Sequence, residues 1–131
     1  MEIEIETEVK IEEKLKTELK NKFQEEKQVA VHCNFKSPPG DIQLIRIWKS
    51  TFLIDNSTGH RSKLLYFENI SLFPFWTPVE ANTNYRFTLI FSALPKDCLF
   101  FDLYEEIPQS GGFHVSGIKR NSQDVYKVKI F

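Results

Sequence analysis

The sequence contains few of the features that assign a chain to a functional class at first sight. Its 131 residues include only two cysteines, which excludes a framework of several disulfides and a cysteine-rich metal site. Cys33 and Cys98 lie beside apolar residues and are expected to be free thiols in the core, with a disulfide between two strands as the alternative. The net charge is −1, which gives no electrostatic footprint for nucleic acid, and no nucleic-acid partner is expected.

Motifs of known enzyme classes and signals for membrane insertion or export are missing as well. The chain has no Gly-x-Ser-x-Gly elbow, phosphate loop, dinucleotide fingerprint or His-Glu-x-x-His motif. No apolar run approaches the length that crosses a bilayer, so no membrane span is expected. The N-terminus lacks a basic region followed by an apolar one. This indicates a cytoplasmic protein as the sequence stands, and a secreted or periplasmic one if an export signal precedes it.

Histidines and carboxylates are too scattered to indicate a catalytic or metal site. His32, His60 and His114 are far apart, and no metal ligand set is predicted from them. Asp102 and Glu105 are separated by an odd number of positions, so on one strand they face opposite ways and do not form a catalytic pair. Asp102 is expected instead to fix nearby backbone or a basic side chain. We therefore predict no catalytic residues, no cofactor and no enzymatic activity.

What the sequence does have is a large apolar and aromatic content. Hydrophobic residues make up 41% of the chain and aromatic residues 14%, including twelve Phe. A chain of this length buries roughly two-thirds of its unfolded surface, which is enough for one core. We expect a single folded domain over residues 29–131, preceded by a Glu/Lys-rich segment over residues 1–28.

The N-terminal segment, residues 1–28, has the pattern of an amphipathic helix. It carries nine Glu and six Lys, a net charge of −3. Ile11, Leu15, Leu19 and Phe23 recur every four residues, which predicts a helix over residues 11–27. The apolar residues also alternate with a period of two over residues 2–9, so a strand is the alternative there. A short helix is marginal alone in water, and this narrow apolar stripe favours self-association or packing on a protein partner over packing on the sheet.

From residue 29 onward the pattern changes to β-branched and aromatic runs separated by turn residues. Seven strands are predicted, over residues 29–35, 42–54, 63–71, 85–92, 100–105, 113–118 and 125–131. No helical period interrupts them. This pattern predicts an all-β fold, an immunoglobulin-like antiparallel β-sandwich of about seven strands.

The alternation within these strands predicts which side chains face the core. The expected core side chains are Trp48, Phe52, Phe87, Leu89, Phe91, Leu103 and Val115. Over residues 42–54, the apolar residues change from odd to even positions at Lys49 and Ser50. This long segment is therefore expected to be bent or split by a bulge at that point.

An aromatic loop over residues 72–78 is the sharpest candidate for a binding site. Its two prolines exclude it from a central strand and make it a semi-rigid crossing or an exposed lip. Phe73, Phe75 and Trp76, with Trp48 if it is exposed, offer rigid contact area for a protein or a sugar ring. The alternative is that these rings cap the open end of the core.

Several segments of the body resemble a known group of domains. The most distinctive is Phe-x-Leu-x-Phe-x-x-Leu-Pro-Lys at residues 87–96, followed by Asp-Leu-x-Glu at residues 102–105. Together with residues 49–55 and 112–118, these segments resemble small uncharacterised β-sandwich domains of Bacteroidota. The resemblance implies a sandwich fold and no activity.

These observations favour a non-enzymatic interaction module. We expect the β-sandwich to bind a protein partner through its loops or edge strands, because an exposed apolar patch or an unpaired edge is what such a partner uses. The alternative is a carbohydrate-binding domain that uses the exposed aromatic rings.

Overall fold

A computed structural model of the chain describes residues 27–131, which contain nine strands and no helix. The helix predicted over residues 11–27 and the alternative strand over residues 2–9 lie outside these residues, apart from Lys27. The strands are β1 (Val29–Lys36), β2 (Gln43–Ile45), β3 (Thr51–Asp55), β4 (Arg61–Glu68), β5 (Thr77–Val79), β6 (Asn84–Phe91), β7 (Phe100–Glu105), β8 (His114–Lys119) and β9 (Val125–Lys129). The prediction of an all-β body is confirmed.

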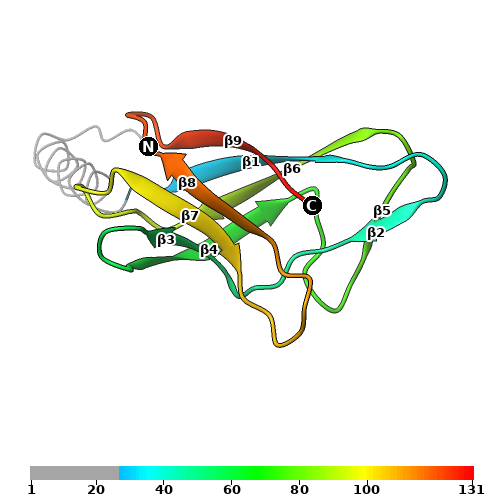
Figure 1. Cartoon of the computed structure of the whole chain (residues 1–131), viewed down its shortest axis with the longest axis horizontal. Coiled ribbons are helices and arrows are strands. Elements are labelled where there is room, and N and C mark those ends of the chain that lie inside the picture. Colours follow the sequence, from blue (N-terminus) through cyan, green and yellow to red (C-terminus); the bar gives the residue numbers. More distant parts are fainter. Residues whose placement is uncertain (1–26) are drawn as a thin grey trace, which may run out of the picture.

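Seven of the strands form one sheet in the order β8-β7-β3-β4-β6-β1-β9, and β2 pairs with β5 in a separate two-stranded sheet (Figure 1). Every pairing is antiparallel except that of β1 with β9, which is parallel. The first and last strands of the described chain are therefore neighbours. β1 runs through the middle of its half of the sheet, between β6 and β9.

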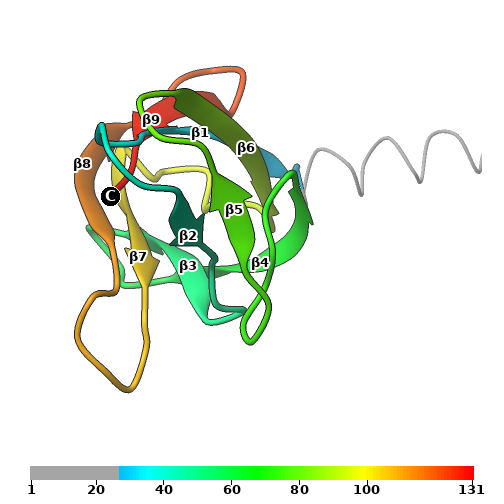
Figure 2. The same cartoon turned by 90° about the vertical axis from the view of Figure 1, so that its right-hand side faces the viewer.

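The large sheet curls so that its two halves face each other across the core, as the end-on view in Figure 2 shows. The turn between the halves lies in β4, whose first residues pair with β3 and whose later residues pair with β6. The register shifts between Leu64 and Tyr66, which is a β-bulge of the kind that bends a strand. Across the core, the ring of Phe101 on β7 meets that of Tyr126 on β9 edge-on, with centroids 4.9 Å apart.

The core is built from alternate residues of these strands. Phe87, Leu89, Phe91 and Leu103 are almost completely buried, as the alternation predicts, and Val115 is partly buried against them. Val29 and Val31 of β1 are fully buried on the same side. Apolar burial of this kind contributes most of the stabilisation of a small domain.

The prediction was wrong for the inner face of β3. Thr51, Leu53 and Asp55 point inward, so Phe52 lies half-buried on the outer face, 5.0 Å from the guanidinium of Arg61. Ile45 and Ile47 also point inward. The inward-facing residues therefore stay at odd positions on both sides of Lys49 and Ser50. Polar residues occupy inward positions here because their side chains are satisfied locally: Thr51 donates to the Trp48 carbonyl at 2.6 Å, and Asp55 accepts from the Ser57 amide at 2.9 Å.

Most strands lie within one to three residues of their predicted bounds, and two differences concern topology. The run over residues 42–54 is split between residues 45 and 51, as expected, but the two strands, β2 and β3, belong to different sheets. β5 was not predicted, because Pro78 argues against a strand. β5 tolerates Pro78 because it pairs with β2 alone, which leaves one edge free of ladder hydrogen bonds.

Both cysteines are buried free thiols, as expected. Burial raises the pKa of each thiol above its ordinary value. His32, next to Cys33 on β1, points to the opposite, solvent-facing side.

Candidate functional site

The exposed aromatic side chains of the predicted loop lie together with apolar residues of β2 at one end of the molecule. Phe75 is 72% exposed, Trp76 49% and Phe73 46%. Ile42 and Leu44 are also exposed. The pairing of β2 with β5 brings these segments together, with Leu44 opposite Pro78. We call the set Ile42, Leu44, Phe73, Phe75 and Trp76 the aromatic patch. In Figure 2 the two-stranded sheet lies toward the viewer at this end of the curled sheet.

The loop that carries the patch is fixed to the body by backbone hydrogen bonds. The Phe73 amide donates to the Ile47 carbonyl at 2.8 Å, and the Ile47 amide donates to the Ser71 carbonyl at 3.0 Å. Within the loop, the Phe75 amide donates to the Leu72 carbonyl at 2.9 Å. The aromatic rings are therefore presented from a backbone that is already ordered.

Trp48 joins this loop, although it is distant in sequence. Its ring stacks on that of Phe73, with centroids 3.9 Å apart and planes inclined by 22°. Trp48 is half-buried rather than fully buried, so its predicted place in the core is only partly correct. All four predicted site residues, Trp48, Phe73, Phe75 and Trp76, are thus at the same end of the molecule.

Sequence reasoning missed Arg46, which lies at the centre of the cluster. Its guanidinium is 3.7 Å from the centroid of Trp76 and 4.6 Å from that of Phe73, within the range of cation–π attraction. It also donates a hydrogen bond to the Pro74 carbonyl at 3.2 Å. The spacing of Arg46 and Trp48, two residues apart on one face of an extended chain, is the signal that could have found it.

A buried carboxylate lies beneath the cluster. Glu105 is 4% exposed, and its Oε2 accepts a hydrogen bond from the Trp48 amide at 3.0 Å. Burial raises the pKa of Glu105 above its ordinary value, although two backbone amides and the nearby Arg46 charge oppose this. A cavity of about 330 Å³ lies beside it, with Leu44, Arg46 and Trp76 among its lining residues.

Substitution of Glu105 by Gln is expected to change how stability depends on pH. Since the pKa of Glu105 is higher in the folded chain, its contribution to stability is present below the ordinary value of 4.5 and is lost as pH rises through the raised value. The stability of the wild type relative to Glu105→Gln should therefore fall as pH rises from below 4.5 to neutral and through the raised pKa. Urea unfolding of both proteins across this range measures it. A difference that stays constant or moves the other way contradicts the raised pKa.

The carboxylate cluster around Asp102 has a structural role. As the odd spacing predicts, Asp102 and Glu105 lie on opposite faces of β7. Asp102 accepts hydrogen bonds from the His114 ring at 2.7 Å and from the Gly117 amide at 2.9 Å. Burial alone would raise the pKa of Asp102, but these hydrogen bonds outweigh it and hold the pKa below the ordinary value. Within residues 27–131, no three His, Cys, Asp or Glu side chains are grouped as a metal site would require.

Comparison with known proteins assigns no function to the chain. No family model matches the sequence, and no curated protein or solved structure matches the chain. The described part of the chain contains no helix with the length and hydropathy of a membrane span.

Proposed function

We propose that this protein is a non-enzymatic module that binds a protein partner through the aromatic patch. The observation that carries the proposal is the exposure of Phe73, Phe75 and Trp76 on a loop whose backbone is held in place. Exposed apolar patches on soluble domains mark interaction surfaces. Aromatic and Arg side chains supply most of the binding energy of protein interfaces, and Arg46 lies among these rings.

The arrangement of the rings favours a protein over a carbohydrate. A sugar ring stacks on an open aromatic face, but Trp48 and Phe73 are stacked on each other, and Arg46 lies over Trp76. The patch also includes the aliphatic side chains Ile42 and Leu44, which fit the apolar side chains of a partner. Carbohydrate binding is the alternative that the experiment below must distinguish.

We further propose that the scaffold is an immunoglobulin-like β-sandwich. Two observations support it: β4 passes from pairing with β3 to pairing with β6, and Phe101 meets Tyr126 across the core. Such a scaffold presents loops at its ends, as the aromatic patch requires. The resemblance to β-sandwich domains of Bacteroidota stays a prediction.

Affinity capture from an extract of the source cells tests the proposed function when three baits are compared. These are the wild type, Phe75→Ala/Trp76→Ala and, as a matched control, Tyr66→Ala, which removes an aromatic ring that is 59% exposed on β4. A protein retained by the wild type and the control but lost from the double variant supports the proposal. Retention of a polysaccharide instead favours the alternative, and equal capture by all three baits contradicts both.

A further inference from the structure

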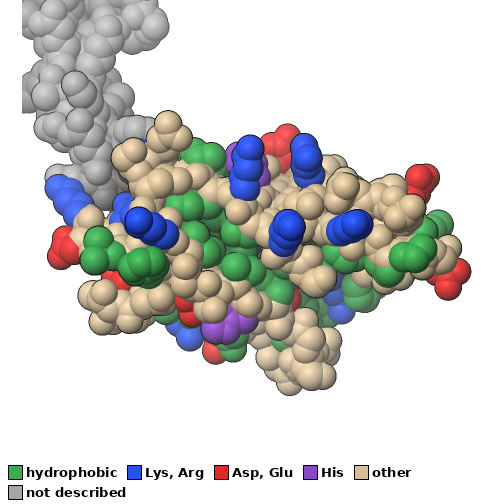
Figure 3. All heavy atoms as spheres, turned by 45° about the horizontal axis from the view of Figure 1, so that its top comes forward, with side chains coloured by type: hydrophobic (Ala, Val, Ile, Leu, Met, Phe, Trp, Pro, Cys, Tyr) green, Lys and Arg blue, Asp and Glu red, His purple; other side chains and the backbone are tan. Residues whose placement is uncertain are grey.

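A second surface, on the outer face of β9, β1 and β6, gathers positive charge. Lys36, Arg86, Lys127 and Lys129 are all exposed there, with His32 among them. Figure 3 shows Lys and Arg side chains along this face, with acidic side chains at its margins. A groove of about 700 Å³ lies along it, and Glu68 on β4 is the carboxylate among its lining residues. We call this surface the basic groove.

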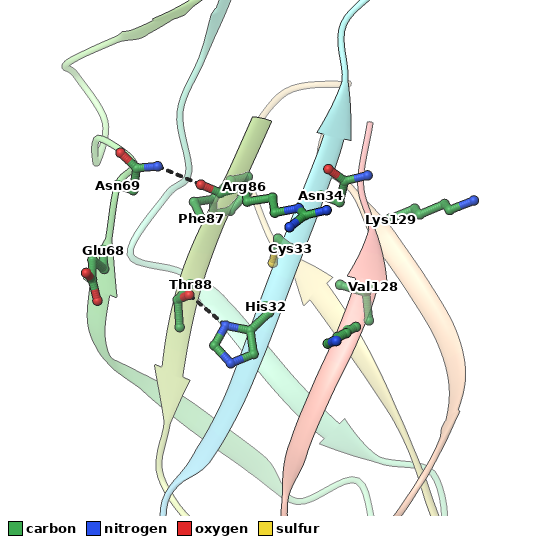
Figure 4. A pocket seen from close by; sticks show the side chains of 11 residues that line it. His32, Cys33, Asn34, Glu68, Asn69, Arg86, Phe87, Thr88, Val128 and Lys129 are labelled. Carbon is green, nitrogen blue, oxygen red and sulfur yellow. Dashed lines mark hydrogen bonds between the residues drawn. The ribbon is translucent and has the colours of Figure 1, made fainter. Parts of the chain in front are cut away.

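Strand register assembles the basic groove from positions that are far apart in sequence. Asn34 lies opposite Arg86 on one side and Lys129 on the other, and His32 lies opposite Thr88 and Lys127 in the same way. The His32 Nδ1 is hydrogen-bonded to the Thr88 hydroxyl at 2.8 Å, as Figure 4 shows. Arg86 reaches from β6 toward Asn34 in the same view.

Within residues 27–131, the cations of the groove form no ion pair, and one buried acceptor has no hydrogen-bond partner. Among the described residues, the ion pairs are made by Arg61, His114 and Arg120, none of which belongs to the groove. Like charges on neighbouring strands repel, so an anionic ligand would relieve this repulsion. Asn34 Oδ1, between these cations, is buried and accepts no hydrogen bond from residues 27–131.

The chain itself carries a segment of matching charge and period. Residues 2–8 contain Glu at positions 2, 4, 6 and 8, and the first cation of the sequence is Lys10. In an extended chain, alternate side chains share one face about 7 Å apart, which is also the spacing of Lys127 and Lys129 on β9. Four carboxylates in such a row have the same interval as the two lysines of β9.

The connection between residues 2–8 and the basic groove is long enough for docking, and it ends at a strand of the groove. β1 begins at Val29 and runs through the middle of the basic groove. Even with the predicted helix over residues 11–27, residues 9–28 span about 35 Å, whereas Asn34 at the middle of the groove lies about 17 Å along β1 from Val29. A segment tethered in this way has a local concentration in the millimolar range, which favours it over the same segment of a second copy.

We propose that residues 2–8 of the chain occupy the basic groove of the same molecule, with their Glu side chains against Lys127, Lys129 and Arg86. This docking is independent of the proposed function, since it uses a different face from the aromatic patch. The contact is electrostatic, so the occupancy of the basic groove by residues 2–8 decreases as ionic strength rises.

Carbodiimide cross-linking of the full chain tests the proposal, because the reagent joins Glu to Lys only where the two are in contact. Equal amounts of unlabelled and ¹⁵N-labelled protein are mixed at low concentration, and the linked peptides are identified by mass spectrometry. We expect links from residues 2–8 to Lys127 and Lys129 within single chains. Lys49 and Lys119, exposed outside the groove, should link far less. About 0.5 M salt should remove the groove links.

Two variants of equal charge change complete the test. Arg86→Glu keeps both reporter lysines and should lower the yield of groove links by about two- to tenfold, whereas Lys63→Glu on β4 should leave it unchanged. Circular dichroism checks that both variants are folded. Links spread evenly over all exposed lysines, or a yield indifferent to Arg86→Glu, would overturn the proposal. Groove links between a labelled and an unlabelled peptide, in the share that random pairing of equal amounts gives, would assign the groove to a second copy and overturn it as well.

Discussion

Replacement of Phe91 by Ala is expected to lower the free energy of unfolding by about 3–5 kcal/mol. The Phe91 side chain is completely buried, and its strand β6 lies between β1 and β4, where Val29 and Leu64 are its partners. The truncated side chain leaves a cavity that flanking strands can close only in part. Small domains are stable by about 5–15 kcal/mol, so this loss is a large fraction of the total.

The matched control for this prediction is Phe75→Ala, which makes the same chemical change at a site that is 72% exposed. Surface substitutions of this kind usually change stability by less than about 0.5 kcal/mol. Guanidinium unfolding of both variants measures the difference. Equal midpoints for the two variants would show that Phe91 is not in the core.

Replacement of Trp76 by Ala is expected to weaken binding of the captured partner by about 30-fold or more, which corresponds to at least about 2 kcal/mol. The substitution removes the largest ring of the aromatic patch and also the surface on which Arg46 rests at 3.7 Å. Because Trp76 is half exposed, the fold should tolerate its loss.

Isothermal titration of the partner against wild type, Trp76→Ala and Tyr66→Ala measures this effect. Tyr66→Ala should bind as the wild type does, since Tyr66 lies on the outer face of β4. A fall in affinity for both variants would indicate a general loss of stability. Unchanged affinity for Trp76→Ala would place the partner elsewhere.

The strands were largely predictable because alternation reports directly on burial. Phe87, Leu89 and Phe91 occupy every second position of β6, and all three point into the core. The inner face of β3 was not predictable in this way, because Thr51 and Asp55 are polar residues whose side chains are satisfied by nearby backbone and side-chain groups. Hydrophobicity alone therefore assigned the face of Phe52 incorrectly.

The aromatic patch was predictable in part. Two prolines among adjacent aromatic residues identified Phe73, Phe75 and Trp76 as a loop, since proline disrupts a central strand. The contact of this loop with Arg46 and Trp48 depends on the isolated bridge between Ile47 and Leu72, which no local pattern reports.

The basic groove could not be predicted from composition. Residues 29–131 carry eleven Lys or Arg and nine Asp or Glu, which is close to neutral. Arg86, Lys127 and Lys129 come from different strands, and only the register of β6, β1 and β9 places them on one face. The expectation of self-association through a helix over residues 11–27 lies outside the described residues and stays a prediction.

Hydrogen exchange of the free and partner-bound protein tests the central claim most directly, because it locates the bound surface. If the aromatic patch is the binding site, amides over residues 42–48 and 72–79 should exchange more slowly in the complex, while those of β8 should not change. Protection confined to β9, β1 and β6, with residues 72–79 exchanging as in the free protein, would contradict the account.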